Sequence, residues 1–274
     1  MKTAFVCVNY NNSKITQDYI VNVLDIKKNY DVKIIVVDNA SEENDVNGLS
    51  VYINCLKNDN VILLKSNSNL GYFKGLNLGM NYLEKSEFDY FVIGNNDLIF
   101  DENFINNLKS KKIKNEVFVI APNIIRLDGV HQNPHIVTKF SPIQNLYRKI
   151  FFSNYYIGIF VQFVYNKLRT KLVKEDRVNN DKEQEILMGY GACYILTKSF
   201  FNIFNELDAP VFLMGEEGIL ANQVLSGNGV TLYCPDLIVN HHDHSSIGKV
   251  PSKTLYKFSQ DSFKYYLKNL KHIQ

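Results

Sequence analysis

Along the first 125 positions, continuous apolar runs alternate with stretches in which apolar residues recur at helical spacing. Five runs are almost continuously apolar and rich in β-branched residues, which is typical of parallel strands covered on both faces. They span residues 3–10, 32–39, 60–66, 90–97 and 117–125. Apolar residues recur at helical spacing from Ile15 to Leu24, and a second helix is predicted to start near Gly71. The repeated strand–helix–strand order predicts an α/β fold with a doubly wound, mostly parallel sheet.

Three of these strands end in small polar residues. The clusters are Asn9-Tyr10-Asn11, Asp38-Asn39-Ala40-Ser41 and Asn95-Asn96-Asp97. The carboxyl ends of parallel strands meet at one edge, where such sheets bind ligands, so the clusters are predicted to line one crevice. Clusters of this kind also form plain turns, which leaves two interpretations of Asp97, a turn residue or a metal ligand. No GxGxxG or GxxxxGK[ST] loop is present, which disfavours a dinucleotide cofactor and a P-loop.

The pattern loosens between about residues 130 and 185. Residues 150–165 are rich in aromatic and aliphatic side chains but too short and too interrupted to span a bilayer. The basic residues around them are Arg148, Lys149, Lys167, Arg169, Lys171 and Lys174. Two hypotheses remain open for this stretch: a pair of core helices, or an interfacial segment against anionic lipid. A predicted amphipathic helix within residues 247–274 repeats the chemistry, with one stripe made of Phe263, Tyr266, Leu267 and Leu270.

Composition narrows the function classes. The 274 residues carry a net charge of +2, far from the basicity of a dedicated nucleic-acid-binding protein. None of the four cysteines lies in a CxxC pair, so zinc and redox sites are disfavoured and buried thiols in a reducing compartment are expected. The absence of a signal-peptide pattern and of a long apolar run favours a cytoplasmic protein.

Seven segments carry a resemblance to a known family. They are "VCVNYNN" at 6–12, "IIVVDNAS" at 34–41, "NSNLGYFKG" at 67–75, "FVIGNNDLIF" at 91–100, "GYGACYILTKSFF" at 189–201, "FLMGEEGILANQV" at 212–224 and "VNHHDHSS" at 239–246. In this order they resemble the family 2 glycosyltransferases of the GT-A fold. The similarity is greatest to bacterial, rhamnosyltransferase-like members that build surface polysaccharides such as O-antigen and capsule.

The resemblance covers most of the chain except about residues 130–185. It implies one domain in four parts. These are a nucleotide-sugar-binding half at 1–125, a lipophilic and basic insertion at 126–187, an acceptor and catalytic half at 188–246, and an amphipathic helix at 247–274.

The family's reaction is an inverting transfer from a nucleotide sugar, here expected to be a UDP- or dTDP-sugar. The implied acceptor is a glycan or lipid-linked glycan at the inner face of the cell membrane. A diphosphate leaves poorly unless its charge is neutralised, which a divalent Mn or Mg ion does. By resemblance Asp97 and His241 hold this cation. His242 is the reserve, because neighbouring residues of an extended chain point to opposite sides. A polar surface turn is the alternative for the histidines.

The family's usual Asp-any-Asp motif is Asn95-Asn96-Asp97 in this chain, so its first acid is missing. Fewer carboxylates predict weaker binding of a hard cation. By resemblance Asp97 remains the metal ligand, while Asn95 is expected to bind ribose or a metal-bound water.

The acid pair Glu216 and Glu217 lies in "GEEG". The resemblance assigns Glu217 as the general base that takes the proton of the acceptor hydroxyl, and Glu216 as a residue that orients acceptor hydroxyls. Ordinary acidic residues at the start of a helix are the alternative.

Donor-binding residues are predicted at the strand ends and at the start of the second helix. They are Asn9, Tyr10, Asn11, Asp38, Asn69, Gly71, Lys74, Asn95, Asn96 and Asp97. Asp38 is expected to accept the pyrimidine N3–H and Tyr10 to stack on the base, while Gly71 permits close backbone approach. Lys74 either contacts phosphate or is a solvated helix lysine.

Other classes stay open. A nucleotidyltransferase needs a basic, glycine-rich loop near the first strand, and "VNYNNSK" has no glycine. A non-catalytic nucleotide-sugar or carbohydrate-binding protein would bind a donor without transferring it. A lipid-surface scaffold would leave Asp97, Glu217 and His241 unexplained.

Overall fold

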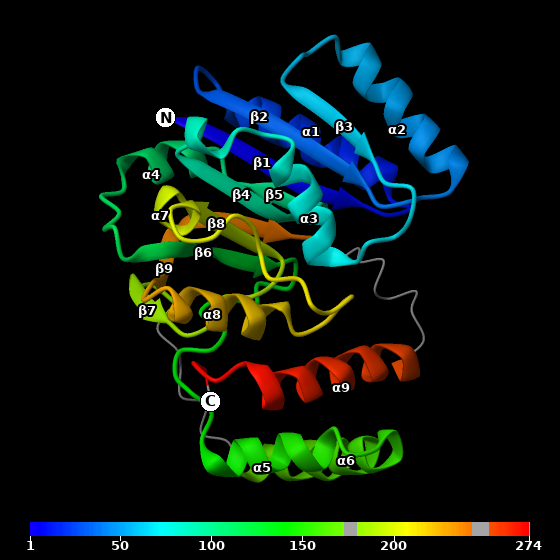
Figure 1. The fold of residues 1–274 in the computed structure, drawn as a ribbon, viewed down its shortest axis with the longest axis vertical. Coiled ribbons are helices and arrows are strands. Elements are labelled where there is room, and N and C mark those ends of the chain that lie inside the picture. Colours follow the sequence, from blue (N-terminus) through cyan, green and yellow to red (C-terminus); the bar gives the residue numbers. More distant parts are fainter. Residues whose placement is uncertain (173–179, 243–251, 274) are drawn as a thin grey trace.

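A computed structural model describes residues 1–172, 180–242 and 252–273 of the chain and has an α/β architecture (Figure 1). The strands are β1 Lys2–Asn9, β2 Asp31–Asp38, β3 Val61–Lys65, β4 Tyr90–Asn95, β5 Leu98–Phe100, β6 Val117–Arg126, β7 Gln184–Ile186, β8 Cys193–Thr197 and β9 Val230–His241. The helices are α1 Ser13–Ile26, α2 Glu43–Leu56, α3 Tyr72–Asn81, α4 Phe104–Ser110, α5 Pro142–Phe151, α6 Tyr155–Leu172, α7 Lys198–Phe201, α8 Glu216–Ser226 and α9 Ser252–Asn269, with a 3₁₀ turn at Lys85–Glu87. The five predicted strands and the two predicted early helices are confirmed.

The strands form one mostly parallel sheet in the order β3-β2-β1-β4-β8-β6-β9-β5. β1 to β4 are mutually parallel where they pair, and β6 is parallel to β9. β8 is antiparallel to β4 and β6, and β5 and β7 are antiparallel to β9. The predicted α/β fold with a mostly parallel sheet is therefore confirmed.

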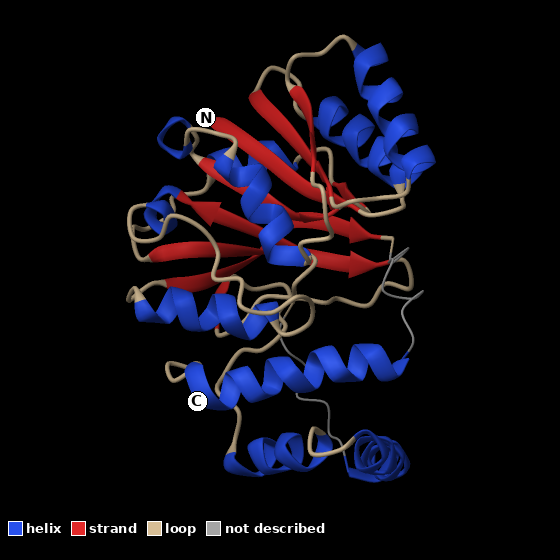
Figure 2. Ribbon diagram, turned by 45° about the vertical axis from the view of Figure 1, so that its right-hand side comes forward, coloured by secondary structure: helices blue, strands red, loops and turns tan. Residues whose placement is uncertain are grey.

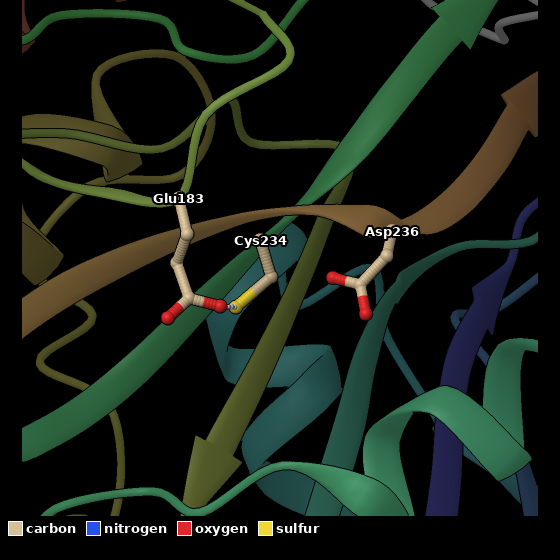
Figure 3. A group of neighbouring side chains, drawn as sticks. All are labelled: Glu183, Cys234 and Asp236. Atoms are coloured by element: carbon tan, nitrogen blue, oxygen red, sulfur yellow. Dashed lines mark hydrogen bonds between the residues drawn. The ribbon is translucent and has the colours of Figure 1, made fainter.

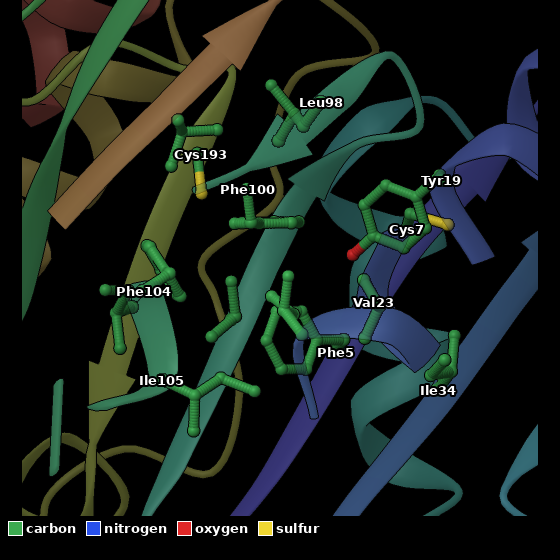
Figure 4. Packing of buried hydrophobic residues seen from close by; sticks show 14 of the residues in the cluster. Phe5, Cys7, Tyr19, Val23, Ile34, Leu98, Phe100, Phe104, Ile105 and Cys193 are labelled. Atoms are coloured by element: carbon green, nitrogen blue, oxygen red, sulfur yellow. The ribbon is translucent and has the colours of Figure 1, made fainter. Parts of the chain in front are cut away.

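Helices cover both faces of the sheet, which explains why its strands are apolar throughout (Figure 2). Along β1, Phe5 and Cys7 face one apolar cluster, and Ala4 and Val6 face the other. The first cluster packs aromatic rings edge to face, with the centroids of Phe5 and Phe100 5.2 Å apart (Figure 4). Burial on two sides fixes this half of the sheet as a rigid support for its loops.

Helices α5, α6 and α9 extend the molecule away from the sheet, with α9 between α8 and the α5–α6 pair (Figures 1 and 2). Most of the apolar stripe predicted in the tail packs within the protein: Phe263, Tyr266 and Leu270 are buried against α8 and Met188. Leu267 is exposed. Within the described residues, no helix combines the length and the apolarity needed to cross a bilayer.

Candidate active site

The three polar clusters meet at one edge of the sheet. β2, β1 and β4 are neighbours and run parallel, with Asn9 opposite Asp38 and Val8 opposite Asn95. Their carboxyl ends therefore lie side by side, as the strand order of the sequence predicts. The site is built on this edge.

Asn9 is buried and organises two carboxylates. Its side-chain amide faces Asp38 Oδ1 at 2.8 Å, Asp45 Oδ2 at 2.9 Å and Ser41 Oγ at 3.1 Å, and its carbonyl accepts from Thr16 Oγ1 at 2.7 Å. Burial raises the pKa of Asp45, but hydrogen bonds from the Asn9 side chain, from the backbone and side chain of Ser13 and from the Ser41 side chain outweigh it and leave that pKa below its usual value. Because its polar atoms are engaged within the protein, Asn9 acts by positioning Asp38 and Asp45.

Tyr10 and Asn11 form the turn after β1. Asn11 has a positive φ of 54°, and its backbone N–H donates to Ser41 Oγ at 2.9 Å. Its side-chain oxygen accepts from the Glu42 N–H at 2.7 Å. The turn is thus locked to the loop after β2, and it presents the exposed Tyr10 ring at the sheet edge.

The loop before α3 is held by Asn39, a member of the polar cluster that ends β2. The Asn39 side chain donates to Asn69 Oδ1 and Gly71 O, both at 3.0 Å. Gly71 has φ +83°, and a Cβ there would lie 2.2 Å from the Phe212 carbonyl oxygen, so only glycine fits. Lys74 is exposed on α3.

Asp97 and His241 meet where β5 pairs with β9. Both are buried, with 4% and 3% of their surfaces exposed, and His241 Nε2 lies 3.2 Å from Asp97 Oδ1. His241 Nδ1 lies 2.8 Å from Gln132 Oε1. The backbone N–H of His242 donates to the Asp97 carbonyl at 3.0 Å. Of the two histidines, the ring of His241 faces the Asp97 carboxylate.

The chemistry of this pair fits a cation. With Nδ1–H donating to Gln132, the Nε2 lone pair points toward Asp97 Oδ1, and that oxygen has no hydrogen-bond donor in the described chain. Two ligands held about 2.1 Å from an octahedral cation at a right angle lie about 3 Å apart. The 3.2 Å between Nε2 and Oδ1 matches that spacing.

Asn95 and Asn96 support the pair from the preceding loop. Asn95 Nδ2 lies 3.5 Å from His241 Nε2, and the Asn95 backbone N–H donates to Ala192 O at 2.9 Å. Asn96 Nδ2 donates to Thr16 Oγ1 at 2.7 Å, which ties the loop to α1.

The acid pair Glu216 and Glu217 forms the first two residues of α8. Glu216 is buried, and its Oε1 has no hydrogen-bond partner in the described part of the chain. Burial, followed by repulsion from Glu217, raises the pKa of Glu216 to about 7 against backbone hydrogen bonds that lower it. Glu217 is half-buried and packs on Gly191, where a Cβ would lie 2.7 Å from Glu217 Oε1. The space at Gly191 is therefore filled by the Glu217 carboxylate.

Tyr72 connects the two halves of the site. Its hydroxyl donates to Gly191 O at 2.7 Å, beside Glu217. Desolvation raises the pKa of Tyr72 well above its usual value, and the charges of Glu216, Glu217 and Asp97 add to this effect. The adjoining Ala192 carbonyl accepts the Asn95 N–H, and Gly191 packs on Glu217, so residues 191 and 192 contact both predicted clusters.

Ring contacts also connect His241, through Tyr190 and His135, to a cavity that Glu217 lines. The Tyr190 ring centroid lies 6.4 Å from that of His241 and 5.4 Å from that of His135. His135 and Glu217 line a cavity of about 210 Å³ between α5, α8 and α9. His135, Tyr190, Tyr72 and Gln132 were not predicted; Gln132 and His135 lie where the sequence pattern loosens, so no sequence signal marked them.

Another acidic cluster lies outside this site. Ligand atoms of Glu183, Cys234 and Asp236 lie within 4.8 Å of one another (Figure 3). Lys111 Nζ approaches Glu183 at 2.7 Å and Asp236 at 2.6 Å. Burial lowers the pKa of Lys111, but its hydrogen bonds to Asp236 and Glu183 raise it to about 12 overall. The protein supplies its own cation here, so the cluster is explained without a metal.

The buried Glu216 predicts a pH-dependent stability. Because the native state keeps this proton up to about pH 7, ionisation in the unfolded chain lowers the free energy of unfolding as pH rises from about 4.5. The loss reaches about 3 kcal/mol above pH 7. Glu216→Gln is expected to melt several degrees above the wild type near about pH 8, with the difference fading toward about pH 5.

Differential scanning calorimetry across this pH range measures the effect. Glu43→Gln is the matched control, since Glu43 is an exposed acid in the first turn of α2. If the difference in melting temperature between Glu216→Gln and the wild type were constant with pH, or grew toward acid, burial would not be what keeps the Glu216 carboxyl protonated.

Structural neighbours share this architecture at low sequence identity. GalNAc-T7 with UDP, GalNAc and Mn²⁺ superposes with a TM-score of 0.60 at 13% identity, covering 98% of this chain and 57% of that one. The mannosyltransferase PcManGT from Pyrobaculum calidifontis has a TM-score of 0.55 at 11% identity, covering 98% and 70%. S. aureus TarS 1–349 with UDP-GlcNAc has a TM-score of 0.55 at 10% identity, covering 92% and 62%. These neighbours confirm the predicted GT-A fold.

The chain thus spans little more than half the length of GalNAc-T7. A search of curated proteins gave no match. A sequence profile described as Glycosyl transferase family 2 matches residues 5–176, which include Asp97 but not Glu217 or His241. That match covers more than half of the 274 residues. The chain belongs to glycosyl transferase family 2.

Proposed function

We propose that this protein is an inverting glycosyltransferase that moves a sugar from a nucleoside-diphosphate sugar to a hydroxyl group of a glycan or lipid-linked glycan. One arrangement supports the proposal: the Tyr190 ring centroid lies 6.4 Å from that of His241, which pairs with Asp97, and the next residue, Gly191, packs against the Glu217 carboxylate. Residues 1–125 then form the donor half and 188–246 the acceptor half, with 126–187 inserted between them.

The donor is proposed to be a UDP- or dTDP-sugar, bound with Mn²⁺ or Mg²⁺. Support comes from the neighbours, which were solved with UDP and Mn²⁺, with GDP-Man and Mn²⁺, or with UDP-GlcNAc. Asp97 and His241 would hold the cation, with His242 as a second candidate ligand. When bound, such an ion neutralises the departing diphosphate. Asn95 in place of a carboxylate predicts modest affinity for the ion.

The nucleoside is proposed to lie along the strand ends. Tyr10 is exposed there and offers a ring for stacking on the base. Asp38, oriented by Asn9, would accept the N3–H of a pyrimidine. The backbone of the Asn69–Gly71 loop would approach the ribose, and the exposed Lys74 would contact phosphate.

The transfer step is a single displacement. The acceptor oxygen attacks the anomeric carbon from the side opposite the diphosphate, and a new C–O bond forms as the bond to the diphosphate oxygen breaks. The electron pair leaves with the diphosphate, and the hydroxyl proton passes to Glu217. Glu216 is proposed to orient acceptor hydroxyls, and Tyr72 to keep the Gly191 carbonyl and Glu217 in place.

The biological setting is proposed to be the synthesis of a bacterial surface polysaccharide, such as O-antigen or capsule, on the inner face of the cell membrane. The support is the resemblance of the motifs to rhamnosyltransferase-like proteins and the lipophilic, basic stretch at 143–174.

A panel of nucleotide sugars tests the function. A donor that binds the native state at about 100 times its Kd stabilises it by about 2.7 kcal/mol. One UDP- or dTDP-sugar is therefore expected to raise the melting temperature by several degrees with Mn²⁺ or Mg²⁺ and much less with EDTA. If no nucleotide sugar stabilises the protein with either ion, the proposal is wrong; stabilisation unaffected by EDTA would reject only the cation.

A further inference from the structure

The α5–α6 pair forms the end of the molecule farthest from the sheet, beyond α9 (Figures 1 and 2). Its apolar side chains are unusually exposed. The structure describes eighteen exposed large hydrophobic residues, and nine of them lie on these two helices. They are Ile143, Leu146 and Ile150 on α5, and Tyr156, Ile157, Ile159, Phe160, Phe163 and Val164 on α6. Exposed fractions reach 80% at Ile143, 71% at Tyr156 and 66% at Phe160.

The opposite side of the pair is firmly packed. The Arg148 guanidinium lies over the rings of Phe140, Phe263 and Tyr266, 4.3 to 5.0 Å from their centroids. Tyr256 Oη donates to the Phe151 carbonyl at 2.6 Å. The inner side therefore joins α5 to α9, so the exposed apolar residues are the outer face of a built structure. We call these nine residues the outer face.

No α5 residue is buried, which excludes the core-helix hypothesis for this helix. Apolar exposure concentrated in this way marks a surface that binds a partner or a membrane. The apolar part of α9 is mostly buried, so of the two lipophilic stretches in the sequence the outer face is the one left uncovered by the described chain.

The charge around the outer face distinguishes between the partners that could cover it. Residues 129–174 contain no aspartate or glutamate and seven lysines or arginines. Lys149 and Lys167 are exposed on the two helices, and Lys167 Nζ lies over the Phe163 ring. A second copy of this face would bring like charges together, whereas an anionic bilayer offers both opposite charge and an apolar interior.

We propose that the outer face docks this protein on an anionic lipid bilayer, with α5 and α6 lying in the headgroup region. Arg148 and Phe152 of the same hairpin segment line the cavity that contains Glu217. Docking therefore holds the catalytic cavity next to the membrane, where an acceptor anchored in lipid would present its sugar. This statement about the acceptor rests on the proposed function; the docking itself does not.

Sedimentation with vesicles tests the docking without turnover. Full-length protein is expected to bind vesicles of phosphatidylcholine with about 30% phosphatidylglycerol, and to bind pure phosphatidylcholine much more weakly. Ile143→Ser combined with Phe160→Ser is expected to reduce binding to the anionic vesicles at least about tenfold. The control variant combines Val51→Ser with Tyr82→Ser. Both residues are exposed, at 63% and 56%, but lie outside α5 and α6, so this variant is expected to bind the vesicles as the wild type does.

Three outcomes would overturn the proposal: no binding by the wild type, equal binding by the outer-face variant, or equal loss in the control variant. Self-association of the wild type that disappears in the outer-face variant, without vesicle binding, would assign the face to a second copy instead. Nucleotide-sugar stabilisation of both variants is measured in parallel. Vesicle binding without any stabilising donor would leave the docking intact and reject the proposed function.

Discussion

Glu217→Gln is expected to lower sugar transfer by about 10²–10⁴-fold while donor affinity stays within about twofold of the wild type. The amide keeps the shape that packs on Gly191 but has no lone pair basic enough to take the hydroxyl proton. Transfer is measured as release of the nucleoside diphosphate in the presence of acceptor, and donor affinity by thermal stabilisation.

Two variants make this result specific. Glu43→Gln removes a first-turn acid from α2 and is expected to leave transfer unchanged, which separates proton transfer from a general effect of acids at helix starts. Near-normal turnover in Glu217→Gln would reject the assignment. If Glu216→Gln alone abolished transfer, the base would be Glu216, whose pKa of about 7 suits proton transfer near neutrality.

Asp97→Asn is expected to remove most of the effect of Mn²⁺ or Mg²⁺ on donor binding and to lower kcat/KM by about 10²–10³-fold. The substitution keeps the size of the side chain but removes the charge beside His241 Nε2. Donor stabilisation with and without EDTA, together with initial rates over a range of ion concentrations, measures both effects.

The matched control is Asp59→Asn, an exposed aspartate in the loop before β3. It is expected to retain the wild-type ion dependence. A variant of Asp97 that still required the ion at an unchanged concentration would place the cation elsewhere. If Asp97→Asn were as active as the wild type and neither depended on the ion, Asp97 would be a turn residue and not a metal ligand.

Local patterns in the sequence were sufficient for the sheet and for its polar edge. The five apolar runs between residues 3 and 125 form strands, as continuous β-branched stretches do where helices cover both faces of a sheet. The meeting of Asn9, Asp38 and Asn95 followed from parallel pairing, since right-handed crossovers return each strand in the same direction. These features depend on the local apolar pattern and on the repeated strand–helix–strand order, both of which are visible in the sequence.

The contacts made by distant segments required the folded chain. Gln132 lies 109 residues from His241, and Tyr72 lies 119 residues from the Gly191 carbonyl that accepts its hydrogen bond. Neither pairing has a periodic signature, because antiparallel β8 and the course of residues 127–137 set them. The burial that raises the pKa of Glu216 and the exposure of the apolar residues on α5 and α6 likewise depend on which other elements pack nearby. The amino-acid order thus specified the polar edge of the sheet, while long-range packing set which side chains meet there and which apolar face stays exposed.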